Sequence, residues 1–398
     1  MRAGRRALLG ALVGFLLGPV LVAGATTPAS AETIEEGQWG LDAIHARDVW
    51  PTTRGEGTVV AVVDTGVDQT HPDLRGRVLP GKDLVGFGAR RGDSAWASHG
   101  TAMAGIIAGR GHGPGDAEGV TGVAPRTRIL PIRVILDQDD PQRRRARTTR
   151  ASALPEGIRW AVDHGADVIN LSLGDDSKSS HPEPAEDEAV QYALGKGVVV
   201  VASAGNGAKD GDRASYPAAY PGVISVTAVD RYGVPGDFST RRWYSSVNAP
   251  GVDVAMADPD RRYYVGWGTS AAAAHVSGVV ALIRSVHPEL SPAQIKRLLE
   301  TTARNSPEGG RSDALGAGLV DASAALAAAE ELEPEPSLPR VSPYPGRHFG
   351  PGPQAADLRP PQGGDLPGAT VAACAVTGAA LLLVAGGLHL HGRRGAGR

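Results

Sequence analysis

Cysteine is nearly absent from this chain, and positive charge is not in excess. One cysteine among 398 residues excludes an intrachain disulfide, a cysteine-based zinc site and a Cys-x-x-Cys redox pair. Lys and Arg number 40 against 43 Asp and Glu, which gives a net charge of −3. Because nucleic-acid binding needs clustered positive charge, this composition argues against a nucleic-acid partner. A hydrophobic content of 41 % is enough to build a sizeable core.

The N-terminal 31 residues have the form of a secretory signal peptide. Arg2, Arg5 and Arg6 precede an apolar run, and Ala29-Ser30-Ala31 offers a small-x-small cleavage site. An uncleaved membrane anchor is the alternative. Only 26 residues separate Ala31 from the first expected strand, which is too few for a separately folded inhibitory prodomain. We therefore expect the mature chain to begin near Glu32.

A second apolar run, residues 369–388, lies near the C-terminus and has no charged residue. At about 1.5 Å per residue it spans about 30 Å, the thickness of one bilayer core. Arginines follow it at positions 393, 394 and 398, and such basic flanks lie on the cytoplasmic side. A buried core helix is the alternative. A cell-wall sorting signal is disfavoured because the threonine of Leu366-Pro367-Gly368-Ala369-Thr370 stands in the wrong position.

A proline-rich stretch precedes this run and cannot pack a core. Residues 334–367 hold ten of the thirty prolines, which is typical of an extended stalk. The sequence therefore predicts one single-pass membrane protein with its domain outside the cell. Its expected parts are a signal peptide (1–31), an N-terminal extension (32–49), a globular domain (50–328), a Pro-rich linker (329–367), a transmembrane helix (368–390) and a cytoplasmic basic tail (391–398).

Within the domain, apolar β-branched runs alternate with helical stretches. Because the runs are continuous rather than alternating, they indicate strands buried on both faces of a mostly parallel sheet. Strands alternating with helices predict a doubly wound α/β fold, in which sites form at the carboxyl ends of strands. The expected strands are 58–63, 129–135, 168–173, 198–202 and 223–229, and the expected helices are 99–108, 155–164, 185–194, 270–286 and 292–302.

Three short motifs carry the candidate chemistry. Asp64 ends the first expected strand in Asp64-Thr65-Gly66, which alone is an ordinary turn. His99 begins a helix of small residues, and Ser270 begins another directly after Gly268-Thr269. Asp, His and Ser in this chain order form one of the known nucleophilic triads, in which His99 takes the serine proton and Asp64 orients the imidazole. Asn206, in a turn after a strand, could donate to the oxyanion together with the Ser270 N–H.

Several motifs in this order resemble the subtilisin-like serine peptidases, or subtilases, over residues 50–325. They are Asp64-Thr65-Gly66-Val67-Asp68, His71-Pro72-Asp73-Leu74, His99-Gly100-Thr101, Gly122-Val123-Ala124-Pro125, Asn170-Leu171-Ser172-Leu173-Gly174, Ala204-Gly205-Asn206 and Gly268-Thr269-Ser270. The resemblance implies Asp64, His99 and Ser270 as the catalytic triad and Asn206 as an oxyanion donor. It also implies a protein or peptide substrate and no cofactor for catalysis.

The same resemblance implies the substrate cleft. Ser172, Leu173 and Gly174 would form one wall, against which the substrate adds as a strand. Ala202, Ser203, Ala204 and Gly205 would form the other side of the pocket for the residue before the scissile bond, with Ser215 near its base.

Two departures from the family pattern stand out. Ala271 and Ala274 stand where the family usually has Met and Pro, but neither position carries a proton in the mechanism. Asp73 matches a family calcium ligand, yet no oxygen-rich loop follows the His99 helix. We therefore expect no metal site, and a turn carboxylate is the alternative role for Asp73.

The layout of signal peptide, subtilase domain, Pro-rich stalk, transmembrane helix and basic tail is similar to that of the mycosins of actinobacterial type VII secretion systems. Gln38-Trp39-Gly40-Leu41-Asp42 and residues 160–170 fit that group. This resemblance implies a membrane-embedded secretion complex as partner. A structural component with accessory proteolysis and a general surface-anchored subtilase remain alternatives.

The segment of residues 137–150 does not belong to any of these motifs. It starts acidic and ends rich in arginine. We expect a solvated loop, with a docking site as the alternative.

Overall fold

A sheet of seven strands, all joined by parallel pairings, forms the centre of the domain, in the order β2-β5-β1-β6-β7-β8-β9. The protein is described by a computed structural model covering residues 34, 36–93 and 95–335, all within the first of two units of the chain. The strands of the central sheet are β1 (Val59–Asp64), β2 (Lys82–Asp83), β5 (Arg128–Arg133), β6 (Val168–Leu171), β7 (Val199–Ser203), β8 (Ile224–Val229) and β9 (Ser245–Pro250).

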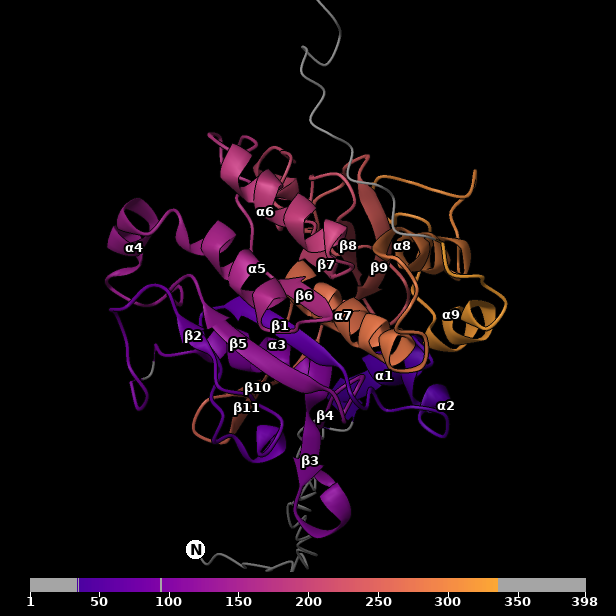
Figure 1. The fold of residues 1–398 in the computed structure, drawn as a ribbon, viewed down its shortest axis with the longest axis horizontal. Helices are drawn as coiled ribbons and strands as arrows, with labels where there is room; N and C mark the ends of the chain where they lie inside the picture. The colour runs from indigo at the N-terminus through magenta and orange to yellow at the C-terminus, as the bar shows by residue number, and fades with distance from the viewer. Residues whose placement is uncertain (1–33, 35, 94, 336–398) are drawn as a thin grey trace, which may run out of the picture. The chain divides into compact units, whose positions relative to one another are not determined.

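Helices cover both faces of this sheet, which is why its strands read as continuous apolar runs (Figure 1). Along β1, Val60 and Val62 point into the core beneath α3 (Ser98–Ala108) and α7 (Thr269–Val286). Their neighbours Val59, Ala61 and Val63 point into the opposite core, beneath α5 (Ala153–Asp163) and α6 (Pro184–Gly195). Burial of each such aliphatic side chain contributes about 1.5–3 kcal/mol to the free energy of folding. Packing on both faces therefore stabilises the sheet.

The prediction of a doubly wound α/β fold with a mostly parallel sheet is confirmed. The five expected strands and five expected helices are all present, with ends that differ by at most two residues. The structure adds elements that the apolar pattern did not reveal. They are α1 (Trp39–Ala43), α2 (Ala46–Val49), α4 (Arg143–Thr149), α9 (Ala322–Ala329), the strands β2 and β9, and the hairpins β3 (Arg110–His112) with β4 (Glu118–Thr121) and β10 (Val254–Asp258) with β11 (Arg262–Gly266).

The segment ahead of the first strand is part of the domain core. Leu41 and Ile44 of the α1 region and Val49 of α2 are buried in the same core as α7. At the other end, the first residues of the expected linker bind α8 (Pro292–Thr301), where Gln294 donates to the carbonyl of Glu333 at 2.8 Å. The predicted signal peptide, most of the predicted linker, the predicted transmembrane helix and the basic tail lie outside the described residues.

The expectation of a solvated loop for residues 137–150 is wrong for the acidic half of this segment. Asp137 is 7 % exposed and Asp140 is 3 % exposed. Asp140 accepts backbone N–H groups from Ala89 at 2.7 Å and Gln142 at 2.8 Å. These bonds could not be expected from the sequence, because Ala89 lies 51 residues away. The arginine half forms the helix α4, which projects at the left edge of Figure 1.

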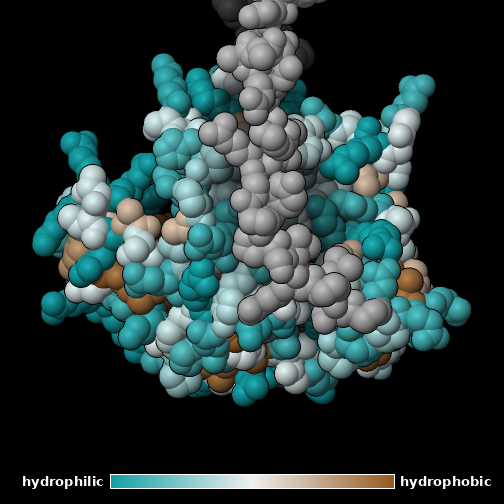
Figure 2. All heavy atoms as spheres, turned by 45° about the horizontal axis from the view of Figure 1, so that its top comes forward, coloured by the Kyte–Doolittle hydropathy of each residue, from teal (hydrophilic) through white to brown (hydrophobic). Residues whose placement is uncertain are grey.

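The face of the molecule drawn in Figure 2 is mainly hydrophilic, with small separate apolar areas. Among the described residues, α7 is the one helix that is long and apolar enough to cross a membrane. It lies in the centre of the domain, however, with 83 % of its apolar window buried by other parts of the chain. Its composition is therefore that of a core helix, in accord with its contacts to β6, β7, β8 and β9.

Candidate active site

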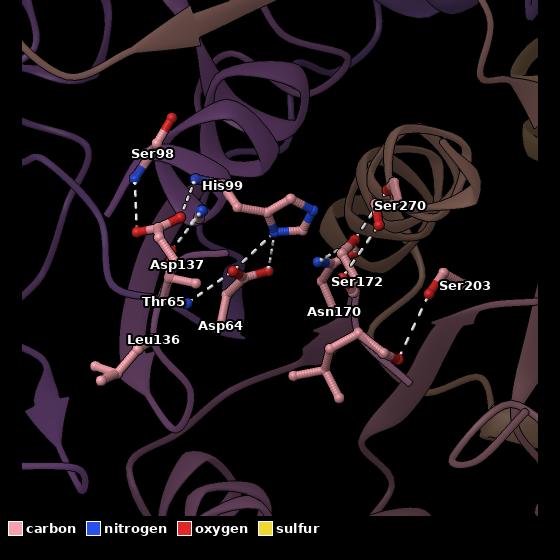
Figure 3. Close-up of polar contacts among 12 residues, drawn as sticks. Asp64, Thr65, Ser98, His99, Leu136, Asp137, Asn170, Ser172, Ser203 and Ser270 are labelled. Atoms are coloured by element: carbon pink, nitrogen blue, oxygen red, sulfur yellow. Dashed lines mark hydrogen bonds and ion pairs between the residues drawn. The ribbon is translucent and has the colours of Figure 1, made fainter. Parts of the chain in front are cut away.

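Three separate elements bring Asp64, His99 and Ser270 together at the carboxyl edge of the sheet. Asp64 ends β1, His99 is the second residue of α3, and Ser270 is the second residue of α7. The Nδ1 atom of His99 lies 2.8 and 2.9 Å from the two carboxylate oxygens of Asp64. Figure 3 shows the imidazole between Asp64 and Ser270, with its second nitrogen on the side of Ser270.

Two threonines tie the aspartate motif to the histidine motif. Thr65 Oγ1 accepts the N–H of Gly100 at 3.1 Å, and Thr101 Oγ1 accepts the N–H of Asp68 at 2.8 Å. Gly100 is required where the two segments cross, because a Cβ there would lie 2.0 Å from the carbonyl oxygen of Gly66. These contacts hold β1 and α3 at the separation that the hydrogen bond between the triad carboxylate and imidazole needs.

The electrostatics of the site favour a protonatable imidazole beside a fixed carboxylate. Asp64 is fully buried and accepts the N–H of Thr65 at 2.7 Å, while the His99 side chain is 36 % exposed. Burial by itself would lower the pKa of His99. The charge and hydrogen bond of Asp64, with the charge of Asp137, outweigh that effect and raise the pKa above its ordinary value. His99 can therefore hold a proton that it takes from a neighbouring hydroxyl.

Ser270 is held by reciprocal hydrogen bonds with Ser172. The Ser270 hydroxyl donates to the Ser172 carbonyl at 3.1 Å, and the Ser172 hydroxyl donates to the Ser270 carbonyl at 2.9 Å. The amide of Asn170 donates to Ser172 Oγ at 2.9 Å, so β6 supports the start of α7 (Figure 3). The hydroxyl must turn from Ser172 to His99 to react, which is common because catalytic hydrogen bonds often tighten only with substrate bound.

Asn206 and the N-terminus of α7 place two hydrogen-bond donors close to Gly268. The Oδ1 atom of Asn206 accepts from Thr269 N at 3.0 Å and from Thr269 Oγ1 at 2.9 Å, which leaves the amide Nδ2 as its outward donor. Gly268, with φ of 150°, lies between them. A Cβ added there would lie 3.7 Å from both Asn206 Nδ2 and Ser270 N. The two donors therefore lie equally close to this point beside Gly268, where they can bind an oxyanion.

We expect Asn206→Ala to lower kcat on the order of 10²–10³-fold, because one oxyanion donor is lost. KM should change little, since this hydrogen bond forms mainly in the transition state. Steady-state kinetics on a peptide substrate measures both. Asn206→Asp is the second variant. It keeps the oxygen that accepts from Thr269 but has no donor, so its kcat should fall as far as that of Asn206→Ala. A loss confined to KM would contradict the assignment.

The two predicted walls of the substrate cleft lie side by side. Leu171, the last residue of β6, pairs with Ala202 near the end of β7, so the segments that follow these two strands leave the sheet side by side. The Ser203 hydroxyl donates to the carbonyl of Leu173 at 3.5 Å, which joins the two segments just beyond the sheet.

Ser215 lies between these two segments. It is fully buried, and Cβ atoms added to Gly174 and Gly205 would lie 2.5 and 3.2 Å from its Oγ. The absence of side chains at both glycines is therefore what makes room for Ser215. The pocket for the substrate side chain, with Ser215 near its base, stays a prediction.

Asp137 belongs to the site, although it lies in none of the sequence motifs. Its two carboxylate oxygens accept the backbone N–H groups of His99 at 3.0 Å and Ser98 at 3.1 Å (Figure 3). The residue before α3, Ala97, has a left-handed backbone and supplies no side-chain cap. Asp137 therefore caps the helix that carries His99, from 38 residues further along the chain. No local capping pattern could have revealed it.

We expect Asp137→Asn to move the acidic limb of the pH profile of kcat/KM to lower pH. The general base works as neutral imidazole, so activity is lost as the pH falls through the pKa of His99. The Asp137 charge helps to raise that pKa, and the amide removes the charge while one oxygen can still cap α3. A pH series on a peptide substrate measures the limb. An unshifted limb would show that Asp137 acts on the helix alone.

Asp73, the predicted counterpart of a family calcium ligand, does not fit a cation site here. It is fully buried, and its oxygens accept from Tyr263 at 2.9 Å and from the N–H of Val120 at 2.8 Å, with His112 Nδ1 at 2.6 Å. Three protein groups therefore already engage the carboxylate of Asp73. Within the described part of the chain, no three His, Cys, Asp or Glu side chains are placed to hold a metal ion.

Comparison with known proteins identifies the family. The family described as "Subtilase family" (Peptidase_S8) matches residues 55–318. The chain belongs to the subtilase family. The chain spans 44 % of the length of one curated relative, fervidolysin, and 61 % of another, the thermophilic serine proteinase of Bacillus sp. (strain AK1). Asp64, His99, Asn206 and Ser270 all lie within the matched region.

Three relatives differ in how much of their length the chain covers. Subtilisin DY of Bacillus licheniformis is 37 % identical over 274 residues, which covers 68 % of this chain and 92 % of that protein. Fervidolysin of Fervidobacterium pennivorans is 40 % identical over 325 residues, which covers 74 % of this chain but 44 % of fervidolysin. The solved structure of MycP1, described as from the ESX-1 type VII secretion system, has a TM-score of 0.62 and 30 % identity. The match covers 77 % of this chain and 88 % of MycP1.

Proposed function

We propose that this chain is a serine endopeptidase in which Asp64, His99 and Ser270 carry out peptide-bond hydrolysis. The observation that carries the proposal is the arrangement of the triad beside two converging donors, Asn206 Nδ2 and Ser270 N. Ser270 Oγ attacks the carbonyl carbon of the scissile bond and gives its proton to His99 Nε2. The negative charge that develops on the carbonyl oxygen is stabilised by the two donors, and Asp64 stabilises the imidazolium.

The same groups complete the reaction. His99 gives its proton to the leaving nitrogen as the carbon–nitrogen bond breaks, which leaves an ester on Ser270. Water then attacks the ester while His99 takes its proton, and the second tetrahedral species expels Ser270 as His99 returns the proton to it. Each step moves one proton through His99, so the site needs no other acid or base.

We propose further that the peptidase is anchored in the cell membrane with its domain outside, and that it is a mycosin of a type VII secretion system. The apolar run 369–388 and the arginines beyond it support the anchor and its orientation. The similarity to MycP1 over 77 % of this chain supports the mycosin assignment. The second candidate is a structural component of the secretion complex with accessory proteolysis, because such a component would have the same similarity to MycP1.

Protease protection tests the membrane proposal. With a tag after Arg398, protease added to intact protoplasts should digest the domain and leave the tag protected, because the tail is cytoplasmic. A variant that lacks residues 369–398 should be released into the medium as active enzyme. Digestion of the tag in intact protoplasts would overturn the orientation, and retention of the truncated variant on the membrane would overturn the anchor.

A further inference from the structure

A concentration of arginine lies on two segments that adjoin α3, the helix that carries the catalytic histidine. Its exposed members come from two neighbouring segments: the loop before α3, and α4 with the residue that follows it. We define the arginine surface by these residues: Arg90, Arg91, Arg144, Arg145, Arg147 and Arg150. Like charges one helical turn apart, such as Arg144 and Arg147, destabilise a helix. The arrangement therefore opposes the local stability of α4, which is favoured by the packing of its Ala146 with Val85, Leu136 and Phe87.

The described structure leaves these arginines without carboxylate partners. Arg145 and Arg150 place their guanidinium groups 4.6 and 5.9 Å from the centre of the Phe87 ring. Arg150 donates to the carbonyl of Val85 at 3.0 Å, and Arg145 donates to Gln142 at 3.3 Å. Among the described residues, none of the six forms an ion pair. The Phe87 ring and neutral acceptors thus hold the guanidinium groups of Arg145 and Arg150, while the positive charge of both stays available.

The buried acidic groups nearest to this surface are already engaged. Asp137 caps α3, and Asp140 accepts the N–H groups of Ala89 and Gln142. The exposed Asp93 accepts the backbone N–H of Arg90 at 2.8 Å rather than its guanidinium.

Exposed acidic groups are too few to balance the arginine surface. Asp93 and Asp139 are the exposed carboxylates of the two segments that form it, within the described residues. Two carboxylates cannot neutralise six arginines, so the surface keeps a net positive charge.

Sheet order places the segment that leads into α4 on the other side of β1 from the predicted cleft wall, residues 172–174. The strand β1, which ends in Asp64, lies between β5 and β6. A peptide bound across the end of β1 therefore lies between the segment after β6, residues 172–174, and the segment after β5, which continues into α4. The bond between Asp140 and Ala89 joins the loop before α3 to this second segment.

We propose that the arginine surface binds carboxylate side chains of the peptide substrate on the amino side of the scissile bond, and so selects acidic substrates. The amino side follows because the predicted cleft wall, residues 172–174, binds the residues before that bond. Guanidinium groups match carboxylates in shape and charge, and several together give a preference that falls with salt. The inference rests on the proposed catalytic site and not on the membrane or secretion role.

Paired peptides test the proposal in the purified enzyme. One peptide carries Glu at the second to fourth positions before the scissile bond, and its partner carries Gln. An exposed ion pair changes an equilibrium by about 1.4- to 5-fold, so we expect wild type to favour the Glu peptide by about fivefold or more in kcat/KM at low salt. The difference should lie mainly in KM, because the contacts form equally in the ground and transition states.

The variant Arg144→Gln/Arg145→Gln/Arg147→Gln should reduce this preference to about one and leave cleavage of the Gln peptide within about twofold. The matched control Arg126→Gln/Arg159→Gln/Arg297→Gln removes the same charge from other surfaces and should keep the preference. No preference in wild type, or a preference that survives in the first variant, would overturn the inference.

Two further outcomes are distinguishable. If neither peptide is cut and a serine-directed phosphonate does not label wild type, the proposed catalytic site itself fails. If the Gln and Glu peptides are cut equally while phosphatidylglycerol vesicles bind wild type and not the first variant, the arginine surface binds lipid. That result would also overturn the substrate proposal.

Discussion

Replacement of Ser270 by alanine is expected to lower kcat/KM for peptide substrates to near background, a loss on the order of 10⁵–10⁶-fold. No other group in the site can supply the attacking oxygen. The fold should persist, because the change removes one hydrogen bond, from Ser270 to the Ser172 carbonyl, which is worth about 0.5–1.5 kcal/mol. A serine-directed phosphonate should label wild type at Ser270 and not the variant.

Ser285→Ala is the matched control. Ser285 lies near the other end of α7 and donates to the carbonyl of Leu282 at 2.7 Å, far along the helix from the triad. Its variant should keep activity. Activity that survives Ser270→Ala in a purified sample would refute the catalytic assignment. In cells, a Ser270→Ala variant that restores secretion to a deletion strain would favour the structural role over proteolysis.

Asp64→Asn should lower kcat by about 10⁴-fold while the fold and substrate binding persist. The oxygen of the new amide can still accept the N–H of Thr65, which Asp64 accepts at 2.7 Å. The amide nitrogen would then face His99 Nδ1 and donate to it. The imidazole proton would move to Nε2, the atom that must accept the serine proton. The site would therefore hold the wrong tautomer.

Two measurements check this explanation. Loss of the Asp64 charge should also lower the pKa of His99, because that charge helps to raise it, and an NMR titration of the imidazole would show the direction. Thermal unfolding should show that the variant is folded. A variant that keeps more than a tenth of wild-type kcat would contradict the tautomer argument.

Several parts of the fold could be predicted because their signals are local. The strand β1 reads as a continuous apolar run, rich in valine, from Val59 to Val63, and such runs are typical of strands buried on both faces of a parallel sheet. The strand β9 gives no such signal, although all six of its residues are buried. Its polar side chains are satisfied from elsewhere: Ser245 donates to the Asp313 carbonyl at 2.9 Å, and Asn248 donates to the Leu315 carbonyl at 2.8 Å.

The sequence by itself determined the identities and chain order of Asp64, His99, Asn206 and Ser270, because each lies in a motif of a few neighbouring residues. Tertiary structure alone decided what surrounds them. Asp137 caps the His99 helix across 38 residues, and a second buried carboxylate holds the loop before that helix across 51. A carboxylate accepts any N–H group that folding brings within reach, and nothing in the neighbouring residues records which one that is.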